Sequence, residues 1–438
     1  MREVYRRNAV ILGNTADREA FMSSRPRVSR YRILCPKLLG GLALCFAAVI
    51  AIALVVFGPE RMLQAVPGVG PTGPDVPYVY VKSNEVTLVR DGKAAARHPG
   101  SFGSIANLRD NLAWTHNGRY FAILEGNDDY GDISARKLIV FDAQTDQVRT
   151  VPCPDCASLA PIRDQQVMIG QRENSIDGNA AQVKTRVLRL SLDSNRPPVV
   201  IQSNLPELTN DMRMVAGTRD NVMVAGSNAD EISQSGGGPE KLFFLSAEGV
   251  ARHIGDTEGN VLVGLTAVSS KPNEASKLAI DTGVRAGFCM SADIVSVVDG
   301  TSGGSTATAD YSLVSPNKKA GLNAGFQAHD LWWDDGALYA TFETWECDDT
   351  KPDPRVLKTP PAVWRLDGNW WKTIDTETVL SKRRINRNRQ LYLLPSESSV
   401  ASGDYSMGST LYVKTHGKMT QVADGVLFVS APAPSLTR

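Results

Sequence analysis

Residues 38–58 read LLGGLALCFAAVIAIALVVFG, an apolar segment without a charged side chain. At 1.5 Å of rise per residue, a helix of this length spans roughly 30 Å, which is the thickness of the hydrocarbon core of a bilayer. The segment therefore predicts one transmembrane helix. It also requires the chain on its two sides to fold as separate parts in different compartments.

The residues before this segment are strongly basic. Residues 1–37 contain nine Arg and Lys against three Asp and Glu, so their formal charge is about +6 and, in a chain that is neutral overall, the remainder carries about −6. Because Arg and Lys accumulate on the cytoplasmic side of membrane segments, we expect a disordered cytoplasmic tail and an exported C-terminal part. The acidic balance of the exported part argues against nucleic acid as a partner.

Processing of the apolar segment has two alternatives. A cleaved signal peptide has a shorter apolar core that ends in small residues, whereas this core ends in FGPERM. We therefore favour an uncleaved signal anchor over cleavage. The predicted localisation is the cell membrane, with a single pass and the C-terminal domain outside the cytoplasm.

The exported part begins with a spacer and continues with an all-β pattern. Residues 59–76 are rich in Pro and Gly, as linkers between domains often are. From residue 77 to 430, short runs of alternating or β-branched residues are bounded by Gly, Asn and Asp, and no long run has the 3.6-residue apolar period of a helix. We predict an all-β domain at 77–430 and a short tail at 431–438.

A turn-and-strand unit recurs in this domain at intervals of about 50 residues. Its sharpest copies are WTHNGRYFAILE at 114–125 and WWDDGALYATFE at 332–343. Asn-Gly and Asp-Gly turns supply the positive φ of a tight hairpin, and the large aromatic side chain can pack between sheets. A repeat of this length with four short strands is typical of a β-propeller blade, and we favour seven blades with six as the alternative.

The unit WTHNGRYFAIL resembles the repeat of TolB-type propellers, in which Trp or a small apolar residue precedes an Asp/Asn-Gly turn and an aliphatic strand. The resemblance implies the fold and no particular chemistry. In such a ring, the last run, DGVLFVS at 424–430, is expected to pair with the hairpin at 78–91 and remove both sheet edges. An immunoglobulin-type array is the alternative, which the even spacing of the strand pairs disfavours.

Four cysteines lie in the exported part, where an even number favours disulfides. Cys153 and Cys156 lie in a CPDC motif that follows a predicted β-hairpin, whereas a thioredoxin-type redox motif lies where a strand enters a helix. We therefore predict a local disulfide loop there. This leaves Cys289 to pair with Cys347, about one repeat away.

An acidic loop at 126–132 is a candidate calcium site, because carboxylates beside Gly can supply the oxygen ligands of Ca²⁺; solvated loop carboxylates are the alternative. The candidate ligands are Asp128, Asp129 and Asp132. No helix-loop-helix calcium loop and no sequence motif of a metal or serine hydrolase occurs, so we predict no other cofactor.

Two clusters of side chains are candidates for ligand binding. Aromatic residues between positions 332 and 371 either form a sugar- or peptide-binding face or pack between blades; they are Trp332, Trp333, Trp345, Trp370 and Trp371. A basic run either binds an anionic cell-wall polymer or lipid headgroup or is a solvated loop; it contains Lys382, Arg383, Arg384, Arg387 and Arg389.

These features favour a membrane-tethered propeller that binds a protein or a cell-envelope polymer, with surface sensing, adhesion or envelope assembly as its role. The alternative is a propeller enzyme, such as a glycosidase, a lyase or a quinone-dependent dehydrogenase, with a site at the central channel. Such a site is assembled from several blades and leaves no local motif, so the fold alone does not decide between the two.

The charge asymmetry generates a test of topology. Protease added to intact spheroplasts should digest the C-terminal domain and spare an N-terminal tag, because only the C-terminal side is exposed. Immunoblots against both ends of the chain, with lysed cells as the control, measure this. Protection of the C-terminal domain would reverse the topology and remove the oxidising compartment on which the disulfide prediction rests.

Overall fold

The computed structural model describes residues 75–103, 108–126, 133–173, 184–206, 210–227, 239–257, 263–269, 277–285, 289, 291–300, 305–307, 324–348, 350, 354–402, 405 and 408–432. The predicted tail and the predicted membrane segment at 38–58 lie outside these ranges. Within these ranges, no helix has the length and apolar character needed to cross a membrane.

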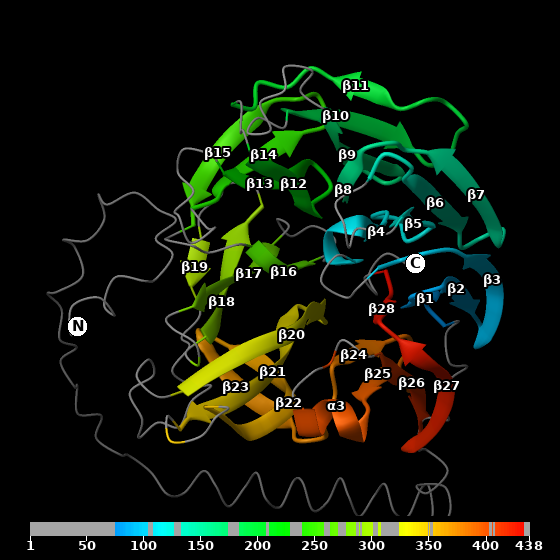
Figure 1. The fold of residues 1–438 in the computed structure, drawn as a ribbon. Coiled ribbons are helices and arrows are strands. Elements are labelled where there is room, and N and C mark those ends of the chain that lie inside the picture. The colour runs from blue at the N-terminus through cyan, green and yellow to red at the C-terminus, as the bar shows by residue number, and fades with distance from the viewer. Residues whose placement is uncertain are drawn as a thin grey trace, which may run out of the picture. The chain divides into compact units, whose positions relative to one another are not determined.

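The described strands form a seven-bladed β-propeller, in which antiparallel four-stranded sheets follow one another around a central axis (Figure 1). This confirms the all-β prediction and the favoured number of blades. Blades 5 and 6 are joined into one sheet by a parallel bridge between Ala292 and Phe326, and the other five blades are separate sheets.

The strands of the first four blades follow the chain from the inside of each blade outward, except that blade 1 receives its inner strand from the C-terminus. Blade 1 contains β28 (Phe428–Ser430), β1 (Tyr78–Lys82), β2 (Glu85–Arg90) and β3 (Lys93–Pro99). Blade 2 contains β4 (Leu112–Trp114), β5 (Tyr120–Glu125), β6 (Lys137–Asp142) and β7 (Gln147–Pro152). Blade 3 contains β8 (Cys156–Ile162), β9 (Gln166–Glu173), β10 (Lys184–Ser191) and β11 (Val199–Ile201). Blade 4 contains β12 (Asn210–Gly217), β13 (Asn221–Ser227), β14 (Lys241–Ser246) and β15 (Ala251–Asp256).

The last three blades follow the same plan. Blade 5 contains β16 (Val263–Val268), β17 (Lys277–Arg285), β18 (Ser291–Asp299) and β19 (Ser305–Ala307). Blade 6 contains β20 (Ala324–Asp334), β21 (Ala337–Cys347), β22 (Arg355–Asp367) and β23 (Trp370–Asp375). Blade 7 contains β24 (Ser381–Arg384), β25 (Arg389–Pro395), β26 (Ser409–Thr415) and β27 (Lys418–Val426). Two short helices complete the described structure, η3 (Arg109–Asn111) before β4 and α3 (Glu397–Ser402) between β25 and β26.

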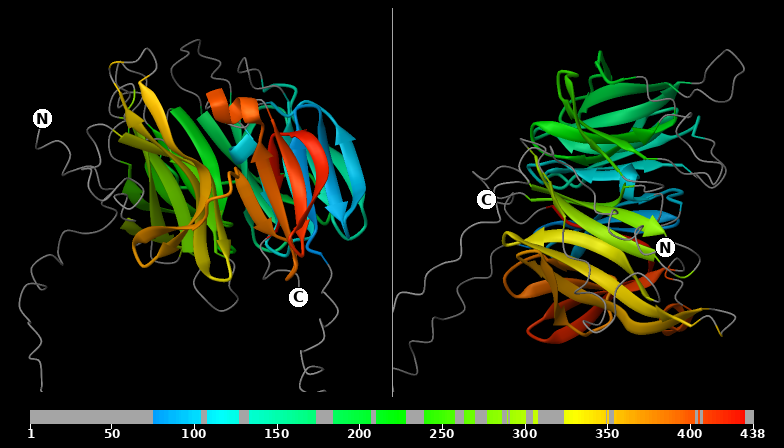
Figure 2. Two further views of the ribbon diagram at one scale, coloured as in Figure 1. Left: turned by 90° about the horizontal axis from the view of Figure 1, so that it is seen from below. Right: turned by 90° about the vertical axis from the view of Figure 1, so that its left-hand side faces the viewer.

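The inner strands run side by side in one direction, which gives the propeller two distinct faces. We call the face at which they begin the upper face; it carries η3, α3 and the loop at 153–156. The face at which they end is the lower face; it carries the turns at 115–119 and 385–388. In the left view of Figure 2, the orange helix α3 lies at the top, on the upper face.

Blade packing explains why the middle strands are continuous apolar runs. In β5, Phe121 and Ile123 contact blade 1, whereas Ala122 and Leu124 contact blade 3. Successive side chains of a strand point to opposite faces, so a sheet that is covered on both faces needs apolar residues at every position. Outer strands such as β7 have one exposed edge, and their burial alternates instead.

The hairpin turns have the backbone conformation that the repeated Asn-Gly and Asp-Gly pairs predicted. Gly118 has a φ of 67° and Gly336 a φ of 75°, both in the region that favours glycine. The turn before β21 therefore needs its glycine, since other residues rarely adopt this conformation.

The ring closes through β28, as the final DGVLFVS run predicted. In the antiparallel ladder between β1 and β28, Tyr80 pairs with Val429 and Val81 with Phe428. Leu427 N also donates a hydrogen bond of 2.8 Å to Val81 O. Because the C-terminal strand fills the inner position of the first blade, the start and the end of the domain hold each other in place.

The chain enters the propeller on the lower face, between blades 7 and 1. Val76 N donates to Ile385 O at 2.8 Å, just beyond the end of the inner strand β24. The carboxylate of Asp75 pairs with Arg389 and accepts a hydrogen bond from Asn386. These contacts fix the start of the described domain on the lower face, opposite to α3.

Ring closure gives a test by truncation. Deletion of residues 427–438 removes β28 and leaves β1 and β24 without their neighbour at the inner edge, so we expect aggregation or a clear loss of thermal stability. Size-exclusion chromatography and thermal melting followed by circular dichroism measure this. Deletion of residues 433–438, which keeps β28, is the control. A monodisperse 1–426 chain with an unchanged melting temperature would contradict closure by this strand.

Candidate functional site

A cavity of about 270 Å³ runs along the axis of the propeller. The inner strands of all seven blades line it, from Leu112 in β4 to Ser430 in β28. Because each blade contributes a few residues, side chains far apart in the sequence meet around this cavity. We describe first its end at the upper face, which we call the upper mouth, and then its end at the lower face.

The helix η3 lies at the upper mouth, next to the start of β4 (Figure 1). From it, Arg109 reaches blade 6, where its Nη2 donates a hydrogen bond of 3.0 Å to His329 O. The neighbouring Asp110 reaches blade 4, where Oδ2 lies 2.8 Å from Arg213 Nη1. Arg109 and Asp110 of η3 therefore link blades 6 and 4 across the mouth.

Arg213 is the centre of an ion-pair network beside η3. Its Nη2 donates to Glu240 Oε2 at 3.0 Å and to Val263 O at 2.7 Å, and Glu240 Oε2 accepts a hydrogen bond of 2.7 Å from Val263 N. Burial by itself would lower the pKa of Arg213, but Asp110 and Glu240 raise it above its ordinary value. The network thus links blades 2, 4 and 5 through a buried carboxylate, Glu240, and two partly buried side chains, Arg213 and Asp110.

Four carboxylates act electrostatically on the guanidinium of Arg109. They are Asp110 from η3, Asp281 and Asp293 from blade 5, and Asp330 from blade 6. Burial lowers the pKa of Arg109, while all four carboxylates favour its charged form. A guanidinium from blade 2 is therefore held among acids of two blades that lie across the axis.

Asp281 differs from the other acids because it is almost completely buried, with 4% of its surface exposed. Burial, and next the charge of Asp293, raise the pKa of Asp281 well above the ordinary carboxyl value, which Arg109 opposes. Asp293 Oδ2 accepts a hydrogen bond of 2.8 Å from Ala328 N, which fixes it against blade 6. The two carboxyl groups face each other diagonally on β17 and β18, where Gly283 pairs with Asp293.

The sixth and seventh blades complete the mouth. Asp330 Oδ2 lies 2.6 Å from Arg383 Nη1, and their side chains are 8% and 16% exposed. Nearby, His329 Nε2 lies 3.4 Å from Glu343 Oε2, and the His329 ring meets the ring of Tyr405 edge-on at 4.8 Å. Burial, with Glu343 beside it, raises the pKa of Tyr405.

Among the described residues around the upper mouth, carboxylates outnumber arginines. The carboxylates are Asp110, Glu240, Asp281, Asp293, Asp330 and Glu343, and the arginines are Arg109, Arg213 and Arg383. With Asp281 protonated, as its raised pKa favours, the acids still outnumber the arginines. Three of these acids are already in ion pairs, since Asp110 and Glu240 lie beside Arg213 and Asp330 lies beside Arg383.

The lower end of the cavity is closer to neutral. Asp334 Oδ1 lies 2.6 Å from Arg384 Nη2, and Trp333 Nε1 donates to Ala267 O at 3.2 Å. Burial lowers the pKa of His116, so this ring is neutral at ordinary pH. A Cβ at Gly217 would collide with Pro161 O, so glycine is needed where β12 approaches β8 here.

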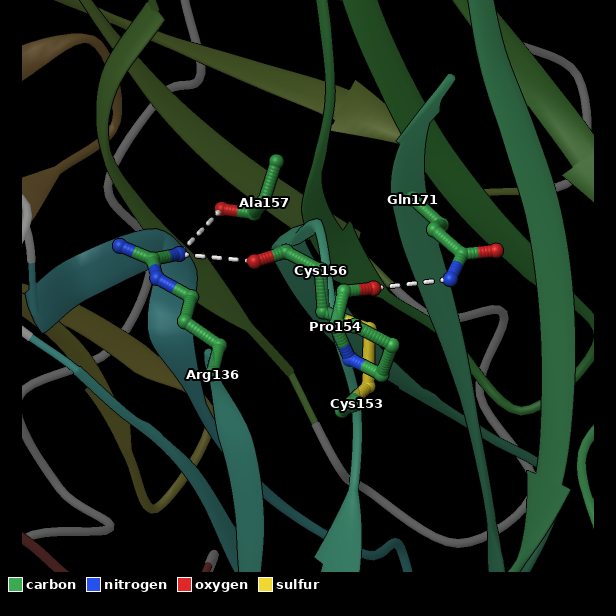
Figure 3. The surroundings of a disulfide bond; sticks show 6 residues. All are labelled: Arg136, Cys153, Pro154, Cys156, Ala157 and Gln171. Carbon is green, nitrogen blue, oxygen red and sulfur yellow. Dashed lines mark hydrogen bonds between the residues drawn. A yellow bond between two sulfur atoms is a disulfide. The ribbon is translucent and has the colours of Figure 1, made fainter. Parts of the chain in front are cut away.

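Both predicted disulfides are present. Cys153 pairs with Cys156, with their Cα atoms 5.5 Å apart, and Cys289 pairs with Cys347, with 6.0 Å between Cα atoms. The first bond lies on the upper face, where Arg136 Nη1 of blade 2 donates to Cys156 O at 2.9 Å (Figure 3). Gln171 Nε2 donates to Pro154 O at 2.8 Å and holds the loop from the side of blade 3 (Figure 3).

The second disulfide joins blades 5 and 6 outside the acidic mouth. Trp345 Nε1 donates to Cys289 O at 2.8 Å, and the Arg355 guanidinium lies over the Trp345 ring. Both disulfides thus fasten neighbouring blades or loops. Their role in this structure is to hold the upper face together.

The candidate aromatic residues do not share one face. Trp332 stacks on Tyr339 with ring centroids 5.7 Å apart, Trp345 and Trp371 are 3% exposed, and Trp333 lines the lower end of the cavity. Trp370, on the outer strand β23, is 53% exposed. Packing within and between blades therefore accounts for most of this cluster.

The basic run is distributed among carboxylates. Within the described structure, four of its five members lie beside an acid. The pairs are Lys382 with Asp375, Arg383 with Asp330, Arg384 with Asp334, and Arg389 with Asp75. Arg387, in the turn between β24 and β25, is exposed. The run therefore serves mainly to join blade 7 to its neighbours.

The candidate calcium ligands Asp128, Asp129 and Asp132 lie outside the described residues. Among the residues that the structure does describe, no group of three or more His, Cys, Asp or Glu side chains is arranged to hold a metal ion.

Sequence analysis included Arg383 in the basic run but missed the acids of the upper mouth and its other two arginines, Arg109 and Arg213. The charged residues of the mouth come from η3 and from blades 4 to 7, so no local motif unites them. A usable signal is a charged residue inside a buried strand, such as Arg213 in NDMRMVAG, Asp281 in KLAIDTGVR and Asp330 in AHDLWWD. Such residues are rarely buried unless they are paired.

No protein-family model and no curated protein matches the sequence. Among solved structures, the β-propeller domain of the Trilobed protease from Pyrococcus furiosus is similar, with 13% identity, coverage of 78% of this chain and 87% of that chain, and a TM-score of 0.46. Pyrococcus horikoshii acylaminoacyl peptidase has 11% identity, with 80% of this chain and 52% of that chain covered and a TM-score of 0.44, so the chain spans about half of its length. A putative TolB from Agrobacterium tumefaciens has 13% identity, coverage of 69% and 89%, and a TM-score of 0.35. These are likenesses of fold, and they assign no family.

The Arg213 network gives a test of stability. Arg213→Met removes the charge but keeps much of the volume, and it leaves Glu240, whose side chain is 3% exposed, without its partner. We expect a loss of about 3–5 kcal/mol in the free energy of unfolding. Chemical denaturation of the detergent-solubilised chain measures this.

Two further variants are matched to that test. Arg219→Met removes an exposed pair with Asp164 on the lower face and should cost about 0–1 kcal/mol. Adding Glu240→Gln to Arg213→Met should restore part of the stability, because the unpaired charge is then gone. Equal effects of Arg213→Met and Arg219→Met would contradict the buried network.

Proposed function

We propose that this protein is a membrane-tethered, extracytoplasmic β-propeller that binds a ligand or partner at the upper mouth of its central channel. The observation that carries the proposal is a cavity of about 270 Å³ whose lining brings together charged side chains of η3 and of blades 6 and 7, namely Arg109, Asp110, Asp330 and Arg383. Concave sites with a few converging polar groups are where proteins commonly bind ligands. Surface sensing, adhesion or envelope assembly are the roles that such a module would serve.

The position at which the chain enters the propeller supports the proposed binding site. Asp75 is fixed on the lower face by Arg389, whereas Arg109 and Asp110 line the cavity from the side of the upper face. The segment at 38–58 is apolar enough to anchor the chain, and the Pro- and Gly-rich residues before Asp75 suit a spacer. Attachment at the lower face would leave the mouth free for a partner.

An enzyme with its site at the same mouth is the second candidate, and Asp281 favours it. A carboxyl group with a raised pKa beside a second carboxylate is an arrangement that glycosidases use for acid and base catalysis. In this case the propeller would cleave the polymer that it binds.

Binding to envelope material tests the first candidate. Full-length protein in nanodiscs should be retained in a saturable manner by envelope fragments from cells that lack it, and Asp330→Asn should weaken retention at least tenfold. Asp164→Asn, which changes an arginine-paired acid on the lower face, is the matched control and should bind as the wild type does. Thermal melting shows whether each variant is folded. Equal loss of binding in both folded variants, or no saturable retention by the wild type, would contradict a binding site at the mouth.

The same incubation separates the two candidates. An enzyme would release soluble fragments from the envelope material, and folded Asp281→Asn would abolish that release while retaining the polymer. A binding module releases none. Product release by the wild type would therefore replace the first candidate with the second.

A further inference from the structure

We propose that a cleft between blades 2 and 3, on the lower face, is a second binding site and that its ligand is a neutral saccharide unit. The cleft has a volume of about 400 Å³, which is in the size range of small-molecule sites. It shares no lining residue with the axial cavity, so the inference goes beyond the function proposed for the upper mouth.

The cleft lies where the link between neighbouring blades differs from the links on either side of it. Arg90, at the end of the third strand of blade 1, donates to Ala143 O of blade 2 at 3.0 Å and pairs with Asp146. In blade 3, Arg189 of the third strand β10 donates to Ala247 O of blade 4 at 2.7 Å. An arginine of the third strand thus bridges each of these two interfaces.

The third strand of blade 2 makes no such bridge. Its last residue, Asp142, pairs within its own blade with Arg119 at 2.8 Å. The bridge to blade 3 comes from the outer strand β7, where Arg149 Nη2 donates to Leu192 O at 2.8 Å. It lies one strand further out than the bridges of the neighbouring interfaces, and the cleft lies beside it.

The cleft combines an apolar floor with a polar rim. Tyr120, Val140 and Leu192 form the floor and are 5%, 2% and 1% exposed. The rim includes the exposed side chains of Gln147 and Asn195. A sugar ring has the matching character, because its C–H groups pack on apolar surface while its hydroxyl groups make hydrogen bonds.

The charges of the cleft favour a ligand without net charge. Two arginines, Arg119 and Arg149, line it together with two acids, Asp142 and Asp193. Arg119 donates from both Nε and Nη2 to Asp142, so that pair is satisfied internally. Asp193 would repel an anion that approached Arg149, and Arg149 would repel a cation that approached Asp193.

Several polar groups of the cleft have hydrogen-bonding capacity left for a ligand. Ser194 Oγ is buried and, among the described residues, has no hydrogen-bond partner, which is costly in the free protein. In the same part of the chain, the amide of Gln147 has no partner, and Asn195 uses only Oδ1, which accepts a hydrogen bond of 3.4 Å from Arg149. Hydroxyl and amide groups both donate and accept, as the hydroxyl groups of a sugar do.

Binding to a saccharide array gives the first arm of the test. Full-length protein in nanodiscs should bind at least one neutral mono- or disaccharide in a saturable manner, on an array that also carries acidic and amino sugars. Gln147→Ala with Asn195→Ala should weaken this binding roughly tenfold or more, because the exposed amides lose their bonds to the sugar.

A matched pair of amides serves as the control for that double variant. Asn84→Ala with Gln144→Ala removes two exposed amides that do not line the cleft, and it should bind as the wild type does. Thermal melting shows that each variant is folded. Absence of binding to any neutral saccharide, binding only to charged sugars, or equal affinity of the two double variants would overturn the proposal.

Ser194→Ala separates a ligand contact from a structural role. Because its hydroxyl has no partner to lose, the variant should keep the melting temperature of the free protein while binding the same saccharide about fivefold more weakly. A folded Ser194→Ala chain with wild-type affinity for the saccharide would contradict the site.

An upper-mouth variant distinguishes this proposal from the proposed function. Asp330→Asn should leave saccharide binding unchanged, because Asp330 lines only the axial cavity. If Asp330→Asn abolished it and the cleft variants did not, the saccharide would belong to the mouth and the cleft site would be refuted. Absence of envelope retention by the wild type would refute the proposed function, and the array would still decide the cleft site.

The source of the saccharide is read from envelope fragments. Weaker retention of the Gln147→Ala, Asn195→Ala chain than of its control would support the cleft site with a polymer of the envelope as the ligand. Unchanged retention, together with lost array binding, would support the cleft site with a free sugar as the ligand.

Discussion

The pairing of β28 with β1 is the contact on which the rest of this structure depends. Each blade buries both faces against its neighbours, so every blade needs a partner on each side, and only a closed ring supplies one for all of them. Val79, Tyr80 and Val81 meet the C-terminal strand in register, and the first and last blades thereby share a core. The central cavity exists because this contact brings seven inner strands around one axis.

Closure of the ring also determines which charged residues are buried and which partners they meet. Arg213, Glu240 and Asp330 lie within or beside strands that the packing of blades removes from water, and each finds its counter-charge on another element. A buried charge that lost its partner would cost several kcal/mol, so these pairs fix how neighbouring blades meet as firmly as the apolar contacts do. The network at the upper mouth is thus part of the architecture and, at the same time, places charged side chains beside the channel.

Contacts between blades also account for the basic run and the tryptophan cluster, the two groups that the sequence indicated as candidate binding sites. Residues 382–389 form a dense basic run in the sequence, but strand β24 and the turn after it direct these side chains to different neighbours, including Asp330 of blade 6 and Asp75 at the start of the domain. The tryptophans of blade 6 are likewise separated, because successive side chains of a strand point to opposite faces. Residues that are neighbours in the sequence therefore lie apart in the structure, whereas residues that are distant in the sequence lie together at the mouth.

The sequence by itself determined the elements and their order. Continuous apolar runs such as YFAILE predicted strands buried on both faces, the Asn-Gly and Asp-Gly pairs predicted the hairpin turns, and DGVLFVS predicted the closing strand, because these depend on local conformation and on a repeat that can be read along the chain. The spacing of Cys289 and Cys347 by about one blade predicted their bond for the same reason. Only the tertiary structure decided where the charges meet. Arg109, Asp281 and Asp330 belong to three different blades, and their assembly depends on the register and rotation of blades around a closed ring, which no local pattern encodes.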